Sequence, residues 1–225
     1  MSKIASFFKD VYEQNDWGDN ESRSGVGSSL AATEKLRTDL PVLLRYLKIK
    51  SLLDAPCGDF NWMNEVDLGE VTYIGGDIVE EVVARNRERY ARPDRQFQVV
   101  DLINDDLPAA DAVMCRDCLI HFNEDLALAA LKNLARSDSR FLLLTTFERL
   151  GGWESLGWVN AELDHEPGLQ VSYRFRPINL RLPPFSLPPP LHLIYETGAS
   201  VHDKALGVWS TEDVRQALAA NDPVA

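Results

Sequence analysis

The stretch SLLDAPCGDFNWM, residues 51–63, decides the fold of this sequence. A short apolar run ends in Asp54, and a sharp turn, PCGD (56–59), follows it. Gly58 can adopt backbone conformations that other residues resist, and it lets a ligand approach the main chain closely. Ligands of open parallel sheets bind at such carboxyl ends of strands. The stretch therefore predicts a buried strand that leads into a ligand-binding loop.

On both sides of this stretch, short apolar runs alternate with helical patterns. Strands are predicted at 51–56, 71–77, 97–101, 111–117 and 140–147, with helices over 79–90 and 123–136. Strands that alternate with helices form a parallel sheet covered on both faces. Two more strands, 191–197 and 204–210, pair about a turn, and a helix over 211–220 is capped by Ser210 or Thr211. The prediction is a doubly wound α/β fold, mostly parallel, that ends in an antiparallel hairpin.

We expect the 225 residues to form a single domain with four parts. Residues 1–49 hold N-terminal helices and a polar lid, and residues 50–147 form the ligand-binding core. Residues 148–190 lack a clear period and read as an insertion on the substrate side, and 191–225 form the terminal hairpin and helix. Within the first part, a helix covers 2–14, and Pro41 either splits the helical pattern of 30–47 or opens a second helix.

Composition and charge exclude several classes of partner. Lysine and arginine number 23 against 35 aspartates and glutamates, a net charge of −12, which disfavours nucleic acids and anionic membrane surfaces. No stretch approaches the roughly 20 apolar residues that span a bilayer, and no signal peptide is visible. The three cysteines are odd in number, and the pair Cys115 and Cys118 has no second CxxC. A cytoplasmic protein without disulfides is expected.

Four predicted strands each end in or near a carboxylate. Asp54, Asp77, Asp101 and Asp117 follow one another in this way, and Asp77 lies 19 residues after Gly58. An acid at about that distance is suited to bind a ribose hydroxyl. The loop is neither GxGxxG nor GxxxxGK[ST], so a dinucleotide fingerprint and a phosphate cradle are both missing. Its acidity suits a cationic ligand.

These motifs resemble the class I S-adenosylmethionine-dependent methyltransferases. Residues 54–59 look like the first motif of that family, although Pro56 and Asp59 stand where glycines are common. Residues 74–78, 100–102 and 111–117 look like the next three motifs. A narrower likeness, to a small bacterial group with the DAPCGDFNWM motif, extends to WGDNESRSGVGSS, RPINLRLPPFSLPPPL and the DKALGVW run. The resemblance implies a Rossmann-like sheet of seven strands and S-adenosylmethionine as the cofactor.

The cofactor residues follow from this resemblance and from the polar loop 15–29. That loop either closes over the cofactor as a lid or is a plain connector, and the cost of exposing Trp17 favours the lid. The expected cofactor residues are Trp17, Ser24, Ser28, Asp54, Pro56, Cys57, Gly58, Asp59, Asp77, Ile78, Asp101, Leu102, Arg116 and Asp117.

His121 and Asp117 are the expected catalytic residues. Methyl transfer to a hydroxyl benefits from a general base, and a neutral histidine is suited to that role. His121 could equally serve to cap the next helix or pack beneath the cofactor. Asp117 could bind the cofactor's amino group, orient His121 or, with Glu148, hold a divalent metal such as Mg²⁺.

The expected substrate residues lie around the insertion. They are Trp62, Glu148, Arg174, Arg176 and Asn179, of which the last three either form a substrate wall rich in hydrogen-bond donors or take part in a salt bridge between segments. Trp153 and Trp158 either stack on a substrate or pack the insertion onto the core. The pair His202 and Asp203 suits a solvated turn better than a site.

The predicted function is S-adenosylmethionine-dependent methylation of a small molecule. The favoured reaction is O-methylation of a hydroxyl on a sugar or polar metabolite. The alternatives are a small-molecule amine N-methyltransferase and a non-catalytic protein that binds S-adenosylmethionine. The sequence does not name the acceptor, and it leaves the oligomeric state open, a homodimer included.

Overall fold

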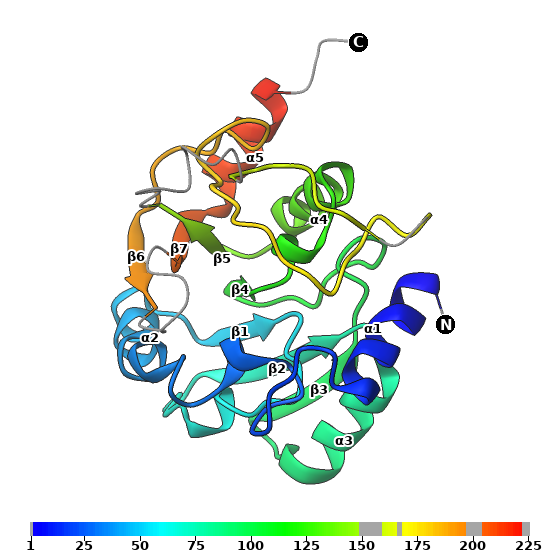
Figure 1. The fold of residues 1–225 in the computed structure, drawn as a ribbon. Coiled ribbons are helices and arrows are strands. Elements are labelled where there is room, and N and C mark those ends of the chain that lie inside the picture. Colours follow the sequence, from blue (N-terminus) through cyan, green and yellow to red (C-terminus); the bar gives the residue numbers. More distant parts are fainter. Residues whose placement is uncertain (1, 149–158, 166–167, 197–203, 222–225) are drawn as a thin grey trace.

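The computed structural model describes residues 2–148, 159–165, 168–196 and 204–221. They form a seven-stranded sheet with helices on both faces (Figure 1). The strand order is β3-β2-β1-β4-β5-β7-β6, and β7 runs antiparallel to both of its neighbours. This confirms the predicted doubly wound sheet with an antiparallel hairpin at the C-terminal end.

The strands are short and lie where the apolar runs predict them. Their bounds are β1 Ser51–Asp54, β2 Thr72–Asp77, β3 Arg95–Val99, β4 Ala112–Cys115, β5 Phe141–Phe147, β6 His192–Tyr195 and β7 Lys204–Ser210. β3 begins and ends two residues earlier than predicted, because it pairs with β2 from Tyr73↔Arg95 to Asp77↔Val99. Asp101 consequently lies in the turn after β3.

Two apolar cores cover the two faces of the sheet. Neighbouring strand residues point to opposite faces, so Leu52 joins one core and Leu53 the other, and Leu143 and Leu144 divide in the same way. One core packs against α4 (Glu124–Arg136) and α5 (Thr211–Asn221), the other against α2 (Glu34–Tyr46). Both faces are therefore buried, as the unbroken apolar strands require.

Helix ends follow the local sequence, with one correction at Pro41. Asn123 caps α4 by accepting from Leu126 N at 3.0 Å, and Ser210 Oγ accepts from Asp213 N in the first turn of α5.

α2 runs unbroken through Pro41, so the prediction of two helices is wrong. Proline inside a helix costs about 3 kcal/mol. Burial of four leucines on the same helix, each worth about 1.5–3 kcal/mol, offsets that cost.

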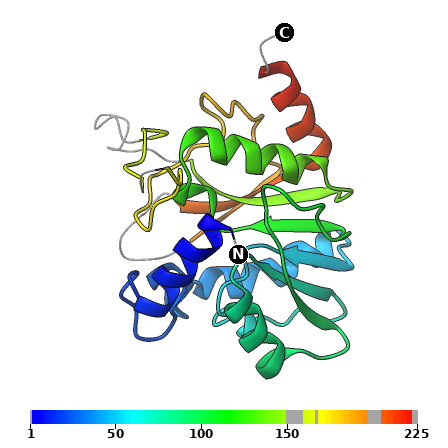
Figure 2. The same cartoon turned by 90° about the vertical axis from the view of Figure 1, so that its right-hand side faces the viewer.

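Two segments cover the carboxyl ends of the parallel strands. α1 (Lys3–Gln14) lies beside α3 (Glu80–Tyr90), where Lys9 pairs with Glu81 at 2.6 Å and Arg85 lies over the ring of Tyr12 (Figure 2). The described part of the insertion packs into the core through Val171, Ile178 and Phe185. Short 3₁₀ helices, η1 Val26–Ser28, η2 Met63–Glu65 and η3 Leu119–His121, lie in the loops at this edge. None of the helices in the described ranges is long and apolar enough to cross a bilayer.

Candidate functional site

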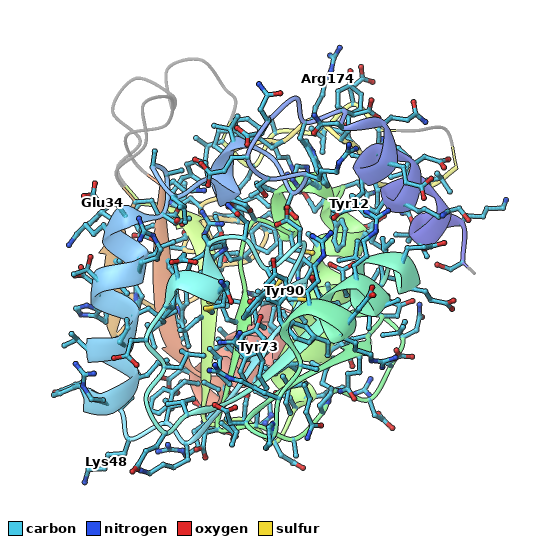
Figure 3. All side chains as sticks on the ribbon, turned by 90° about the horizontal axis from the view of Figure 1, so that it is seen from below. Tyr12, Glu34, Lys48, Tyr73, Tyr90 and Arg174 are labelled. Carbon is cyan, nitrogen blue, oxygen red and sulfur yellow. The ribbon has the colours of Figure 1, made fainter. Side chains whose placement is uncertain are left out.

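A cavity of about 1000 Å³ lies at the carboxyl ends of the parallel strands. Asp54, Asp77, Asp101 and Asp117 all line it, so the structure brings together the four acids that the sequence places at successive strand ends. Tyr12 and Arg174, which also line it, lie at one end of the molecule, and Lys48 lies at the opposite end (Figure 3). The cavity is at the upper limit of about 300–1,000 Å³ for small-molecule pockets, so it offers room for a cofactor and a second ligand.

The turn after β1 places Asp77 at the cavity wall. Gly58 has φ +54°, and its N–H donates to Asp77 Oδ2 at 3.1 Å, while Val79 N donates to Oδ1 at 2.9 Å. A Cβ atom on Gly58 would lie 2.3 Å from Ser24 Oγ, so a side chain is excluded there. Burial raises the pKa of Asp77 to about 6, although the N–H groups of Val79, Gly58 and Ile78 act in the opposite direction. The carboxylate retains acceptor capacity, which suits a ribose hydroxyl.

Asp54 and Asp101 are fixed in different ways. Asp54 Oδ2 accepts from the Tyr73 hydroxyl at 2.7 Å, and burial raises the pKa of Asp54 to about 7. Asp101 closes its own turn, where it accepts from Ile103 N at 2.9 Å and from Asn104 Nδ2. Other predicted residues share the wall with them. They are Pro56, Cys57, Ile78, Leu102 and Arg116.

Replacement of Asp77 by asparagine is expected to weaken binding of S-adenosylhomocysteine by about 10- to 100-fold. The amide cannot accept two hydroxyls as the carboxylate does, and hydrogen bonds to charged groups contribute about 1.5–3 kcal/mol.

The affinity of the wild-type protein for S-adenosylhomocysteine should also fall about tenfold from pH 8 to pH 5, because the ionised Asp77 is the acceptor and its pKa lies near 6. Isothermal titration calorimetry measures both effects. Asp106→Asn, on an exposed turn, is the control, and a dissociation constant unchanged in Asp77→Asn would contradict this role.

The polar loop 15–29 is bound to the β1 turn over the cavity. The Ser22 hydroxyl and Arg23 N donate to the carboxylate of Asp59, and Asp59 N donates to Ser24 Oγ at 2.9 Å. Ser24 and Ser28, two of the expected cofactor residues, line the cavity. Asp59 does not line it, so the structure corrects its predicted cofactor role: its carboxylate instead holds the loop. These bonds favour a lid over a plain connector.

Trp17 joins this loop to the insertion. Its Nε1 donates to the Tyr173 carbonyl at 2.9 Å, and its ring centroid lies 5.6 Å from that of His121. The indole lies at the cavity wall and connects loop 15–29 to the insertion, which is more than 150 residues away in sequence.

Another wall is formed by four charged residues, of which Arg116 and Glu196 are buried and Asp117 and Lys204 are half-buried. Arg116 makes a bidentate pair with Glu196 at 2.6 and 3.0 Å, and Lys204 lies 2.9 Å from Glu196 and 2.7 Å from Asp117. Arg116 also donates to the Gly27 carbonyl at 2.6 Å and lies over the Trp62 ring. Although burial acts in the opposite direction, Arg116 and Lys204 hold the pKa of Asp117 far below its usual range. Two cations balance two acids, which is what a largely buried cluster requires.

His121 lies at the end of η3 and is half-buried at the cavity. Its Nδ1 is 2.9 Å from the Arg174 carbonyl oxygen. A carbonyl can only accept, so Nδ1 carries the proton and the neutral ring has its lone pair on Nε2. Burial lowers the pKa of His121 below its ordinary value of 6.5. The ring is therefore mostly neutral near pH 7, in the form that a general base needs.

Three of the five predicted substrate residues lie outside the cavity. Glu148 pairs with Arg181 at 3.2 Å, and Arg176 is buried and donates to the Ala161 carbonyl at 2.8 Å. Asn179 is also buried and accepts from Arg181 N. Arg176 and Asn179 thus bind backbone groups of the irregular insertion and do not form the predicted hydrogen-bonding wall at the cavity. Trp62 and Arg174 do line the cavity.

The described residues offer no group of three or more His, Cys, Asp or Glu side chains that could hold a metal ion. Asp117 is instead occupied by Lys204 and Arg116, and Glu148 by Arg181. The described donors thus do not fit the expected magnesium site. Trp153, Trp158, His202 and Asp203 lie outside the described residues.

Sequence reasoning missed Glu196, Lys204 and the contribution of α1. Glu196 directly follows β6 and Lys204 begins β7, and both residues line the cavity. In the sequence, each of them is only one charged residue at one end of an apolar run. This signal did not suffice, because only the placement of β7 beside β5 brings the two residues to Asp117.

No family model matches the chain, and no curated protein matches it in sequence. Solved structures do match. Human N-acetylserotonin methyltransferase in complex with SAM aligns with a TM-score of 0.56 and 15% identity, over 89% of this chain. The N-terminal domain of EvdMO1 aligns at 0.52 and 16% over 90%, and TnmH at 0.55 and 16% over 80%.

This chain has their fold. It covers 96% of the EvdMO1 domain, but only 58% of the human enzyme and 55% of TnmH. It covers 66% of the methyltransferase domain of a bacterial Hen1. At these identities the likeness establishes the architecture, and the chemistry has to be argued from the residues at the cavity.

Proposed function

We propose that this protein transfers a methyl group from S-adenosylmethionine to a hydroxyl oxygen of a small molecule. The observation that carries the proposal is the joint position of four strand-end aspartates, the Gly58 turn and His121 around one cavity. The fold shared with human N-acetylserotonin methyltransferase, solved with SAM, supports it.

The cavity wall fits the cofactor chemically. Asp77 offers two carboxylate oxygens for ribose hydroxyls, and Ile78, Leu102 and Asp101 line the wall beside it, as an adenine ring requires. Asp54 and Asp117 also line the wall, where their carboxylate oxygens can accept hydrogen bonds from the ammonium group of the cofactor. When bound, S-adenosylmethionine supplies a methyl group activated by its positive sulfur.

In this proposal the protein aligns the acceptor and removes its proton. The Arg174 carbonyl holds His121 by Nδ1, so that Nε2 receives the hydroxyl proton. Ser172 N donates to the His121 carbonyl at 2.9 Å and Arg176 N to the Ile120 carbonyl, so the insertion fixes η3 from both sides. With cofactor and acceptor bound, the lid and the lining aromatic residues would reduce the access of water to the reacting atoms.

The two alternatives make different demands on the same site. An amine acceptor needs no strong base, so the fixed tautomer of His121 would have no role in N-methylation. A protein that only binds the cofactor needs neither His121 nor room for a second ligand. The sugar acceptor expected from the sequence is supported by the D-fucose in the EvdMO1 structure, but the loss of Arg176 and Asn179 from the wall weakens it.

Titration of the protein with S-adenosylhomocysteine tests the cofactor part of this proposal. We expect one site per chain with a micromolar dissociation constant, and no binding of NAD⁺, because the β1 turn lacks the glycine pattern that receives a pyrophosphate. Equal binding of NAD⁺, or no binding of S-adenosylhomocysteine, would overturn the proposal.

A further inference from the structure

We propose that the methyl acceptor is a hydroxylated aromatic ring, bound in a chamber formed by Phe8, Trp17, Phe122, Tyr173 and Phe175. The inference rests on the proposed function and narrows its substrate class. These five residues, called the aromatic chamber below, all line the cavity together with His121.

The rings of the aromatic chamber are arranged around His121. Phe8 stacks on Trp17 with centroids 6.5 Å apart and lies 6.4 Å from Phe122, and the Trp17 ring is 5.6 Å from that of His121. The rings come from α1, the lid and the segment after η3, and residues 173–175 of the insertion complete the wall. A planar ring placed among them would stack on one face and meet the edges of the others.

Tyr173 and Phe175 leave much of their surface to solvent. They are 41% and 48% exposed, although each lines the cavity. Exposed apolar surface costs about 25 cal/mol per Å² relative to burial. Exposed aromatic rings that border a cavity mark a place where a ligand restores the burial. An apolar, flat ligand gains most from covering them.

The charged side chains nearest to His121 are already paired with one another. Asp117 pairs with Lys204, and Arg116 pairs with Glu196, so they offer few free partners to an acceptor with several hydroxyls. A sugar brings several hydroxyls into the site, and each that loses water without a new partner costs about 1–3 kcal/mol. Arg176 and Asn179, whose side chains could have paired with them, are buried and lie outside the cavity lining. The chamber thus suits one hydroxyl aimed at His121 and an apolar remainder.

The chemistry of the base agrees with this geometry. Burial lowers the pKa of His121, so its Nε2 is a weaker base than an exposed imidazole. A phenolic hydroxyl with a pKa near 10 gives up its proton far more readily than an aliphatic hydroxyl, which resembles water at 15.7. In the step, the phenolic proton moves to Nε2, and the oxygen bonds to the methyl carbon as the carbon–sulfur bond breaks. The products are an aryl methyl ether, an imidazolium and a neutral thioether.

Matched acceptors test the inference. The wild-type enzyme is incubated with methyl-labelled S-adenosylmethionine and either catechol, cyclohexane-1,2-diol or D-fucose, and the labelled product is quantified. We expect kcat/KM for catechol to exceed that for the saturated ring by about 100-fold or more. Preferential labelling of D-fucose or of the saturated diol would overturn the aromatic acceptor while leaving methyl transfer intact.

Two variants and a binding measurement complete the test. Phe175→Ala is expected to raise the KM for catechol about tenfold and leave S-adenosylhomocysteine affinity unchanged, whereas Tyr46→Ala, 81% exposed on α2, should change neither. An unchanged KM in Phe175→Ala would count against the chamber. Catechol binding to the protein loaded with S-adenosylhomocysteine is followed by tryptophan fluorescence. Binding without any transfer would refute the proposed function and retain the aromatic site, and no binding would refute the inference itself.

Discussion

Replacement of His121 by glutamine is expected to lower kcat by about 10²- to 10⁴-fold, the usual contribution of a general base. Glutamine retains a hydrogen-bonding group near the Arg174 carbonyl but has no nitrogen that can take up a proton. The dissociation constant for S-adenosylhomocysteine should stay within about twofold of wild type, because the cofactor residues are unchanged. Steady-state kinetics with a methylated product as readout measures the loss.

The pH profile separates a base from a structural histidine. The imidazolium cannot accept a proton, so wild-type kcat should fall on the acidic side with a midpoint below 6.5, where burial places the pKa of His121. The His121→Gln variant should lack this acidic limb. His192→Gln, exposed on β6, is the control and should behave as wild type. A kcat of His121→Gln within twofold of wild type would remove the base from the mechanism and favour an amine acceptor.

Replacement of Glu196 by alanine is expected to destabilise the protein by about 3–5 kcal/mol, the cost of breaking a buried ion pair. The Arg116 guanidinium would lose its bidentate partner, and Asp117 alone would face both cations. Urea denaturation at pH 7 measures the difference. A milder variant, Glu196→Gln, retains hydrogen bonding and covers the case in which the alanine variant does not fold.

The control for this effect is Glu70→Ala. Glu70 is 4.0 Å from Lys50, and both side chains are largely exposed, so its loss should cost no more than about 1 kcal/mol. Equal losses in the Glu196 and Glu70 variants would show that the charged cluster is not a buried network.

The strands could be predicted from the sequence because both faces of the sheet are buried. Runs such as LLLTT in β5 leave little choice of conformation when each neighbouring residue meets a different core. Pro41 and the start of β3 could not be predicted in the same way. Leucines that pack against the sheet carry α2 through the proline, and pairing with β2 determines where β3 begins, so tertiary contacts override both local signals.

The residues of the candidate site could likewise be predicted only in part. Asp54, Asp77, Asp101 and Asp117 could be predicted, since the carboxyl ends of neighbouring parallel strands meet at one edge of the sheet. Arg176 and Asn179, which the sequence places equally well at a substrate wall or in a salt bridge, lie buried outside the cavity lining. Irregular segments leave many backbone groups without regular partners, and buried polar side chains of the insertion satisfy those groups.

Location of the transferred methyl group shows directly whether the acceptor atom is oxygen and whether His121 is the base. Methyl-labelled S-adenosylmethionine is supplied with a panel of hydroxyl and amine acceptors, and mass spectrometry with fragmentation locates the label in the product. We expect label on an oxygen, formed by the wild-type protein and lost in His121→Gln while S-adenosylhomocysteine still binds. Label on nitrogen only, or label on oxygen that persists undiminished in His121→Gln, would contradict this mechanism.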